Sequence, residues 1–161
     1  MAANAPLNPA AGNALAVSIR PARTSAEIEE AAAIYERAGG AAFVWRPQDH
    51  FKAADFKRHA LEEEVWLAFF GTSILGLLSL YHDERFVHSL YVDLEAQHLG
   101  IGNALVRHVR AQSGGPLTLK VDAPNEAAIA FYEHTGWKRL HRPGDSGTDE
   151  QGIIWLRYRL D

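Results

Sequence analysis

Two glycines, Gly100 and Gly102, stand one residue apart in the stretch QHLGIG, between a strand-like run, VHSLYVD, and a helix-like run, NALVRHVRAQ. The first turn of a helix offers unpaired N–H groups and a partial positive charge, and glycine removes the side chains that would keep an anion away. Arg107 and Arg110, further along the helix, would add positive potential. The pattern therefore predicts a main-chain cradle for a phosphate or pyrophosphate group.

A plain strand–turn–helix connection, in which the glycines serve only the turn, is the alternative interpretation. The loop is not a P-loop, because no Gly-Lys-Ser/Thr follows it, and it lacks the GxGxxG spacing of a dinucleotide fingerprint. It also follows several strands and two helical runs instead of opening a doubly wound fold. Taken alone, the loop leaves both interpretations open.

The chain has no cysteine and eight histidines. Disulfides, thiolate metal sites and acyl-cysteine intermediates are therefore excluded. The histidines do not show metal-ligand spacing on any one helix or strand, so we predict no metal.

The elements that must position the glycine loop follow from hydrophobic periodicity. VSIRPAR forms a first strand, Thr24 or Ser25 caps a helix that Gly39 and Gly40 stop, and a second helical region covers 47–64. The complete order is β-α-α-β-β-β-α-β-α-β-β: 17–23, 25–38, 47–64, 65–70, 73–83, 85–93, 102–112, 117–122, 125–136, 137–142 and 152–160, with a polar loop at 143–151. One parallel crossover lies within a mostly antiparallel sheet, which is an α/β (α+β) arrangement.

The 161 residues predict one domain at 16–161, preceded by a flexible tail at 1–15. The net charge of −4 disfavours charge-driven binding to nucleic acid and is compatible with a cationic small substrate. No run approaches the roughly 18 apolar residues of a membrane helix, and the start lacks the features of a signal peptide. We therefore expect a cytoplasmic protein with no membrane or nucleic-acid partner.

Two blocks of residues resemble motifs of the GCN5-related N-acetyltransferase (GNAT) superfamily. Q-x-x-G-x-G after a strand ending in L-Y-V-D resembles its motif A. Asn125-x-x-Ala128-x-x-x-Tyr132-x-x-x-Gly136-Trp137 resembles its motif B, and one helix and one strand separate the two blocks. The resemblance covers roughly 17–160 and implies a six- to seven-stranded mixed sheet flanked by about four helices.

The resemblance implies that acetyl-CoA is the cosubstrate. Strand 85–93 would diverge from strand 117–122, and the pantetheine arm would lie between them. Asn125 would face the pantetheine, and Tyr132 would approach the sulfur. The pantetheine would pair with main-chain groups of Leu90, Tyr91 and Val92, and the pyrophosphate would sit on the amides of His98, Leu99, Gly100, Ile101, Gly102 and Asn103.

Two side chains are candidates for proton transfer. Tyr132 would be the general acid at the departing thiolate, with core packing as the alternative explanation for an aromatic residue there. His88 would be the general base, since strand alternation predicts that it shares a face with Leu90 and Val92. VHSLYV resembles the arylalkylamine acetyltransferase branch, but that branch's second histidine falls at Phe86. The relay would thus be incomplete, and Glu84 and Tyr91 are substitutes.

The predicted activity is direct transfer of an acetyl group to a primary amine within a ternary complex. A small amine or amino-acid-like acceptor is favoured, while a peptide N-terminus, a lysine side chain or an aminoglycoside remains open. Trp45, Phe51 and Phe56 are either an apolar acceptor wall or helix packing. The rival functions are a non-catalytic acyl-CoA sensor and a nucleotide-phosphate binder of another fold. The strands at 137–142 and 152–160 offer edges for a homodimer.

Overall fold

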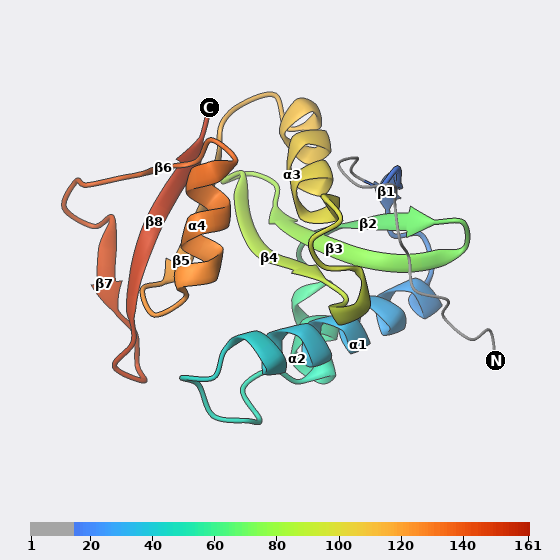
Figure 1. Ribbon diagram of the computed structural model, residues 1–161, viewed down its shortest axis with the longest axis horizontal. Coiled ribbons are helices and arrows are strands. Elements are labelled where there is room, and N and C mark those ends of the chain that lie inside the picture. The colour runs from blue at the N-terminus through green and yellow to red at the C-terminus, as the bar shows by residue number, and fades with distance from the viewer. Residues whose placement is uncertain (1–14) are drawn as a thin grey trace.

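A single mixed sheet organises the computed structural model, which describes residues 15–161. Its strand order is β1-β2-β3-β4-β5-β8-β6, with β7 also paired to β8 (Figure 1). The strands are β1 Ser18–Pro21, β2 Glu64–Phe70, β3 Ser73–Tyr81, β4 Phe86–Val92, β5 Leu117–Asp122, β6 Lys138–Arg139, β7 Ser146–Thr148 and β8 Ile154–Leu160. The helices are α1 Ser25–Ala42, α2 Ala53–His59, α3 Ile101–Gln112 and α4 Glu126–His134, with a short 3₁₀ helix, η1, at Leu94–Ala96.

The predicted fold class and order of elements are confirmed, with one strand added. All pairings are antiparallel except that of β4 with β5. Nearly all of the predicted tail, residues 1–14, lies outside the described residues. No helix within 15–161 is long and apolar enough to cross a bilayer.

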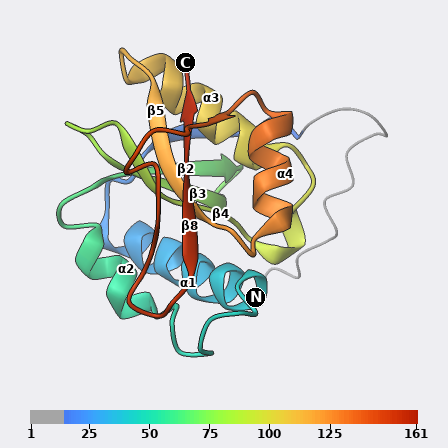
Figure 2. The ribbon, with the colours of Figure 1, turned by 90° about the vertical axis from the view of Figure 1, so that its left-hand side faces the viewer.

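The helices cover both faces of the sheet and form two buried clusters (Figure 2). The α1/α2 cluster joins Tyr35, Phe51 and Phe56 to inward residues of β2 and β3. The α3/α4 cluster includes Leu105 and Val109, with further contributions from β3, β4, β5 and β8. Burial on both faces explains the nearly continuous apolar run of β3, which would otherwise alternate with polar residues.

Gly39 and Gly40 do not end α1, which continues to Ala42. A Cβ on Gly39 would lie only 2.5 Å from Cδ1 of Phe51. The glycine therefore admits the aromatic ring against the helix, and it serves close packing instead of termination.

The predicted helix at 47–64 is shortened to α2, with turns before it and an irregular connection into β2 after it. The predicted polar loop at 143–151 contains β7, where Gly147 is opposite Trp155. A Cβ on Gly147 would lie 2.8 Å from Cζ2 of that indole, so glycine permits the pairing. Because β8 pairs with β5 on one edge and with β6 and β7 on the other, it has no open edge for a partner among residues 15–161.

The pairing of β4 with β5 is limited to Phe86 opposite Thr118 and Val87 opposite Leu119. Beyond these residues the two strands diverge, and β4 pairs only with β3 within the described chain. A register shift leaves His88 as an extra residue, since Val87 pairs with Leu80 and Ser89 pairs with Ser79. This β-bulge lies where the strands separate, so it reorients side chains at the start of the opening.

Candidate active site

A cleft of about 880 Å³ lies at the opening between β4 and β5. Its walls come from α1, the connection between α1 and α2, β4, the loop before α3, β5 and α4. A cavity of this size is typical of small-molecule and cofactor sites.

The glycine loop, residues 97–102, forms one end of this cleft. Gly100 has φ +82° and is the N-cap of α3, and His98 also has a positive φ, of +63°. No side-chain cap bonds the first-turn amides, so these N–H groups remain available to an anion. A Cβ on Gly102 would lie 3.4 Å from Cζ of Phe131, so its small size also lets α3 begin close to α4.

The predicted cofactor residues are mostly, but not all, brought together at the cleft. Leu99 does not line it: its carbonyl accepts a hydrogen bond from Leu15, at 2.9 Å, and its side chain packs against the α3/α4 cluster. The lining residues among those predicted are Leu90, Tyr91, Val92, His98, Gly100, Ile101, Gly102, Asn103, Asn125 and Tyr132.

Asn125 and Tyr132 are both positioned by α4. Asn125 is the N-cap of that helix, and its Oδ1 accepts a hydrogen bond from the amide of Ala128 at 3.1 Å. The side-chain NH₂ group is therefore the part of Asn125 that is left for a ligand. Tyr132 packs edge-on against Trp137, with ring centroids 5.5 Å apart. Burial raises the pKa of Tyr132, so its phenol stays protonated and can donate.

His88 lines the cleft, but not in the orientation expected from strand alternation. Leu90 and Val92 pack against the α3/α4 cluster. His88 instead contacts the α2 side, with its ring 4.8 Å from that of His59 and 5.4 Å from that of Tyr81. The bulge explains the difference, because one extra residue shifts the alternation.

A buried glutamate holds His88 in place. Nδ1 of His88 lies 2.6 Å from Oε1 of Glu63, whose side chain is 0% exposed. Burial alone would raise the pKa of Glu63, but His88 and the hydroxyls of Ser79 and Tyr81 together more than offset it and lower the pKa below its ordinary value. An ionised Glu63 accepts the Nδ1 proton, which leaves Nε2 with a lone pair. The sequence signal for Glu63 was slight: the middle glutamate of an EEE run before β2.

A network around Arg46 joins three distant segments at one wall of the cleft. Arg46 Nε lies 2.7 Å from Oδ2 of Asp122, and its Nη2 lies 2.8 Å from Oδ2 of Asp149. Trp45 Nε1 donates to the same Asp122 oxygen at 2.9 Å. We call Trp45, Arg46, Asp122 and Asp149 the Arg46 network. It fixes the α1–α2 connection against β5 and the β7–β8 turn, and its three charged members were not among the predicted site residues.

Four further candidates differ in their placement. Phe51 lines the cleft, whereas Phe56 is buried in the α1/α2 cluster, as the packing alternative predicts. Tyr91 lines the cleft, and burial raises its pKa well above the ordinary value. Glu84 is exposed and does not line the cleft, so it is poorly placed to replace His88.

Comparison with known proteins identifies the family. The family model for the acetyltransferase (GNAT) family matches residues 28–137, which include β4, the glycine loop and α4. The chain belongs to the GNAT acetyltransferase family. The predicted membership is therefore confirmed, and an acyltransferase activity is supported.

Solved GNAT-like structures share the fold. The apo form of YjaB from Escherichia coli has a TM-score of 0.72 and 23% identity, covering 90% of this chain and 97% of that one. PaiA N-acetyltransferase from Thermoplasma acidophilum, solved with coenzyme A, has a TM-score of 0.68 and 15% identity, covering 89% and 98%. Mycothiol acetyltransferase of Paenarthrobacter aurescens (strain TC1) is 42% identical over 57 residues. That match spans 33% of this chain and only 18% of the relative.

The cleft of this GNAT domain fits coenzyme A in three respects. The first-turn amides of α3 lack a side-chain cap, and the edge of β4 that faces β5 has no partner strand beyond Val87 within the described residues. The cleft runs continuously from the glycine loop to His88. An extended, amide-containing arm with a diphosphate at one end matches these features.

Proposed function

We propose that this protein is an acetyl-CoA-dependent N-acetyltransferase that acts on the primary amine of a small or amino-acid-like acceptor. The observation that carries the proposal is the His88–Glu63 pair at the point where β4 and β5 diverge. This placement puts a candidate base beside the end of the cleft opposite the glycine loop.

Each residue has a distinct part in the proposed reaction. The acetyl thioester supplies an already activated carbonyl, so a neutral amine can attack it directly. Alkyl amines arrive mostly protonated at neutral pH, and Nε2 of His88 removes the proton. Glu63 keeps the ring oriented and stabilises the resulting imidazolium. The Tyr132 hydroxyl donates toward the departing sulfur, and its raised pKa keeps the proton available.

The acceptor end of the cleft favours a small molecule. The Arg46 network fixes the α1–α2 connection to the far side of the opening. Phe43, Phe51 and Tyr91 form an aromatic surface beneath it, with the rings of Phe43 and Phe51 4.6 Å apart. An aromatic surface below a restrained loop suits a compact acceptor with an apolar part better than a long peptide chain.

Release of free coenzyme A thiol across a panel of amines, amino acids and peptides tests the function. We expect wild-type turnover with at least one small amine. His88→Gln should lower kcat roughly 100-fold without changing coenzyme A affinity in calorimetry. Unchanged kcat in that variant would contradict the role of His88.

The same measurements distinguish the rival functions. Tight coenzyme A binding with no turnover on any amine would favour an acyl-CoA sensor. Turnover confined to peptides would favour a protein or peptide N-acetyltransferase. Absence of coenzyme A binding by folded protein would remove the foundation of all three functions.

A further inference from the structure

His59, Glu63 and His88 form a cluster of potential metal ligands next to the cleft. His59 is the last residue of α2, Glu63 lies in the connection to β2, and His88 is the bulged residue of β4. One ligand atom from each residue lies within 4.8 Å of the others. Ligand spacing within single helices or strands predicts no metal, but these three donors come from separate segments.

Glu63 has a binding capacity that the protein does not use. Its Oε1 bonds to His88, whereas its Oε2 is buried and forms no hydrogen bond of good geometry among the described residues, although the hydroxyls of Ser79 and Tyr81 lie near the carboxylate and help to lower its pKa. A buried carboxylate oxygen without a partner carries a desolvation cost that a second cationic group would offset. The second oxygen of Glu63 is therefore available to a cation without loss of the contact with His88.

The donor set has a definite chemical preference. Two imidazole nitrogens and one carboxylate suit borderline first-row divalent ions such as Zn²⁺ and Co²⁺. Bonds to zinc of about 2.1 Å place tetrahedral ligands roughly 3.4 Å apart, so a ring shift of about 1 Å would close the cluster.

We propose that His59, Glu63 and His88 bind a first-row divalent cation, and that the bound ion inhibits the enzyme by occupying His88. The binding site stands on the cluster alone, whereas the inhibition rests on the proposed function. An imidazole nitrogen that coordinates a cation cannot accept a proton, and a closed cluster also fixes the ring away from the amine.

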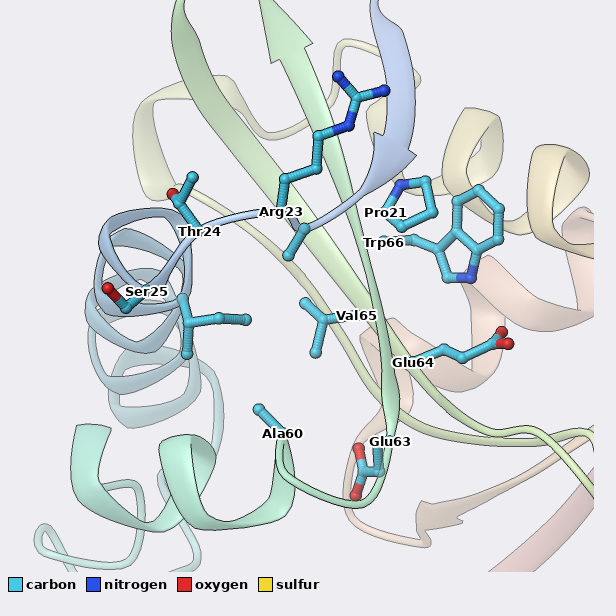
Figure 3. A pocket seen from close by; sticks show the side chains of 11 residues that line it. Pro21, Arg23, Thr24, Ser25, Ala60, Glu63, Glu64, Val65 and Trp66 are labelled. Carbon is cyan, nitrogen blue, oxygen red and sulfur yellow. The ribbon is translucent and has the colours of Figure 1, made fainter.

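An ion has a route to Glu63 from a cavity other than the cleft. Glu63 also lines a second cavity of about 420 Å³, bounded by the β1–α1 connection, Ala60 and the start of β2. Figure 3 shows Ala60 and Glu63 on the segment that leads from α2 into β2, at the base of this cavity. Access would therefore not require displacement of a bound cofactor.

Calorimetric titration of the full chain with ZnCl₂, free of coenzyme A, tests the site. We expect one saturable ion per chain, and His59→Asn should weaken binding at least 10-fold. Co²⁺ titrated in parallel should develop visible d–d absorption in wild type but not in that variant. His82→Asn is the matched control: His82 forms an exposed pair with Glu64, at 2.9 Å, close to the cluster in sequence but without a third donor.

The outcomes separate this proposal from the proposed function. Equal zinc affinity in wild type and His59→Asn, absence of saturable binding, or loss of binding in His82→Asn would each overturn the site. Because calorimetry needs no turnover, these results hold even if no acceptor is found. Where turnover is measurable, zinc should lower the kcat of the wild type. In His59→Asn, the zinc concentration needed for inhibition should rise by the same factor by which zinc binding weakens. Thermal unfolding in EDTA checks that the variant is folded.

Discussion

The two ends of the cleft differ in the groups that form them: main-chain groups at one end and side chains at the other. The proposed cofactor end consists of main-chain groups of the glycine loop and β4, which are contiguous in sequence. The proposed acceptor end depends on side chains from distant segments: Arg46 meets Asp122 and Asp149, and Glu63 meets His88. A main-chain site leaves a short sequence signature because it needs glycine and a helix start. A side-chain site leaves none until the fold brings its parts together.

The comparison predicts that Gly100→Val acts on the cofactor end alone and has the largest effect. A β-branched residue at φ +82° is strained and adds bulk at the first turn of α3. We expect coenzyme A affinity to fall roughly 100-fold, or about 2.7 kcal/mol, in calorimetry. Gly144→Val, at φ +89° in a loop outside the cleft, imposes similar backbone strain and should leave affinity unchanged. Equal losses in both variants would show that strain, not the cradle, is responsible.

Arg46→Met should affect the acceptor end and the stability of the domain. The side chains of Arg46 and Asp122 are only 9% and 12% exposed, so removing the cation leaves the Asp122 carboxylate with the indole N–H of Trp45 but no counter-charge from Arg46. We expect the free energy of unfolding to fall by about 2 kcal/mol in urea denaturation, with a higher KM for the amine.

The matched control is Arg37→Met, which removes the exposed pair with Asp93. Its cost should stay below about 0.5 kcal/mol. Coenzyme A affinity that dropped in Arg46→Met as much as in Gly100→Val would mean that the two ends are not independent.

Glu63→Gln should have an intermediate effect, confined to turnover. The amide keeps the shape of the side chain but removes the negative charge that orients His88 and stabilises its protonated form. We expect kcat to fall about 10-fold while coenzyme A affinity is retained. Glu63→Asp should recover part of the loss, and Glu64→Gln, at the neighbouring exposed glutamate, should behave as wild type. No change in kcat would remove Glu63 from the proposed mechanism.

Tyr132→Phe should produce the smallest effect on stability, and it depends on pH. Burial raises the pKa of Tyr132 above its value in the unfolded chain. The contribution of this tyrosine to the free energy of unfolding is therefore fully present below about pH 10 and is lost as the pH rises further. At about pH 10, where half of the phenol groups in the unfolded chain are ionised, this ionisation lowers the free energy of unfolding by about 0.4 kcal/mol. Urea denaturation at about pH 8 and pH 10 should therefore show a smaller alkaline loss in the variant. An identical loss in both proteins would contradict the raised pKa.

The fold and the cofactor end could largely be predicted from sequence because both depend on local patterns. Periodicity gave the order of elements, but Gly39 was mistaken for a helix stop because its contact with Phe51 is not local. Residues 47–64 carry helical periodicity, yet aromatic packing of Phe51 and Phe56 leaves only α2 helical. At the acceptor end, His88 was found but assigned to the wrong face, since a bulge has no sequence marker here. Glu63, Arg46 and Asp122 become distinctive only as partners.

The short pairing between β4 and β5 has a mechanical consequence. The sheet is continuous there over two residue pairs only, so within the sheet the part with β5 and β8 is joined to the part with β4 by few hydrogen bonds. A ligand lying along β4 would act as a temporary ninth strand that links the two parts of the sheet. When the ligand binds, amide hydrogen exchange should then slow in both β4 and β5, including at residues that the ligand does not contact.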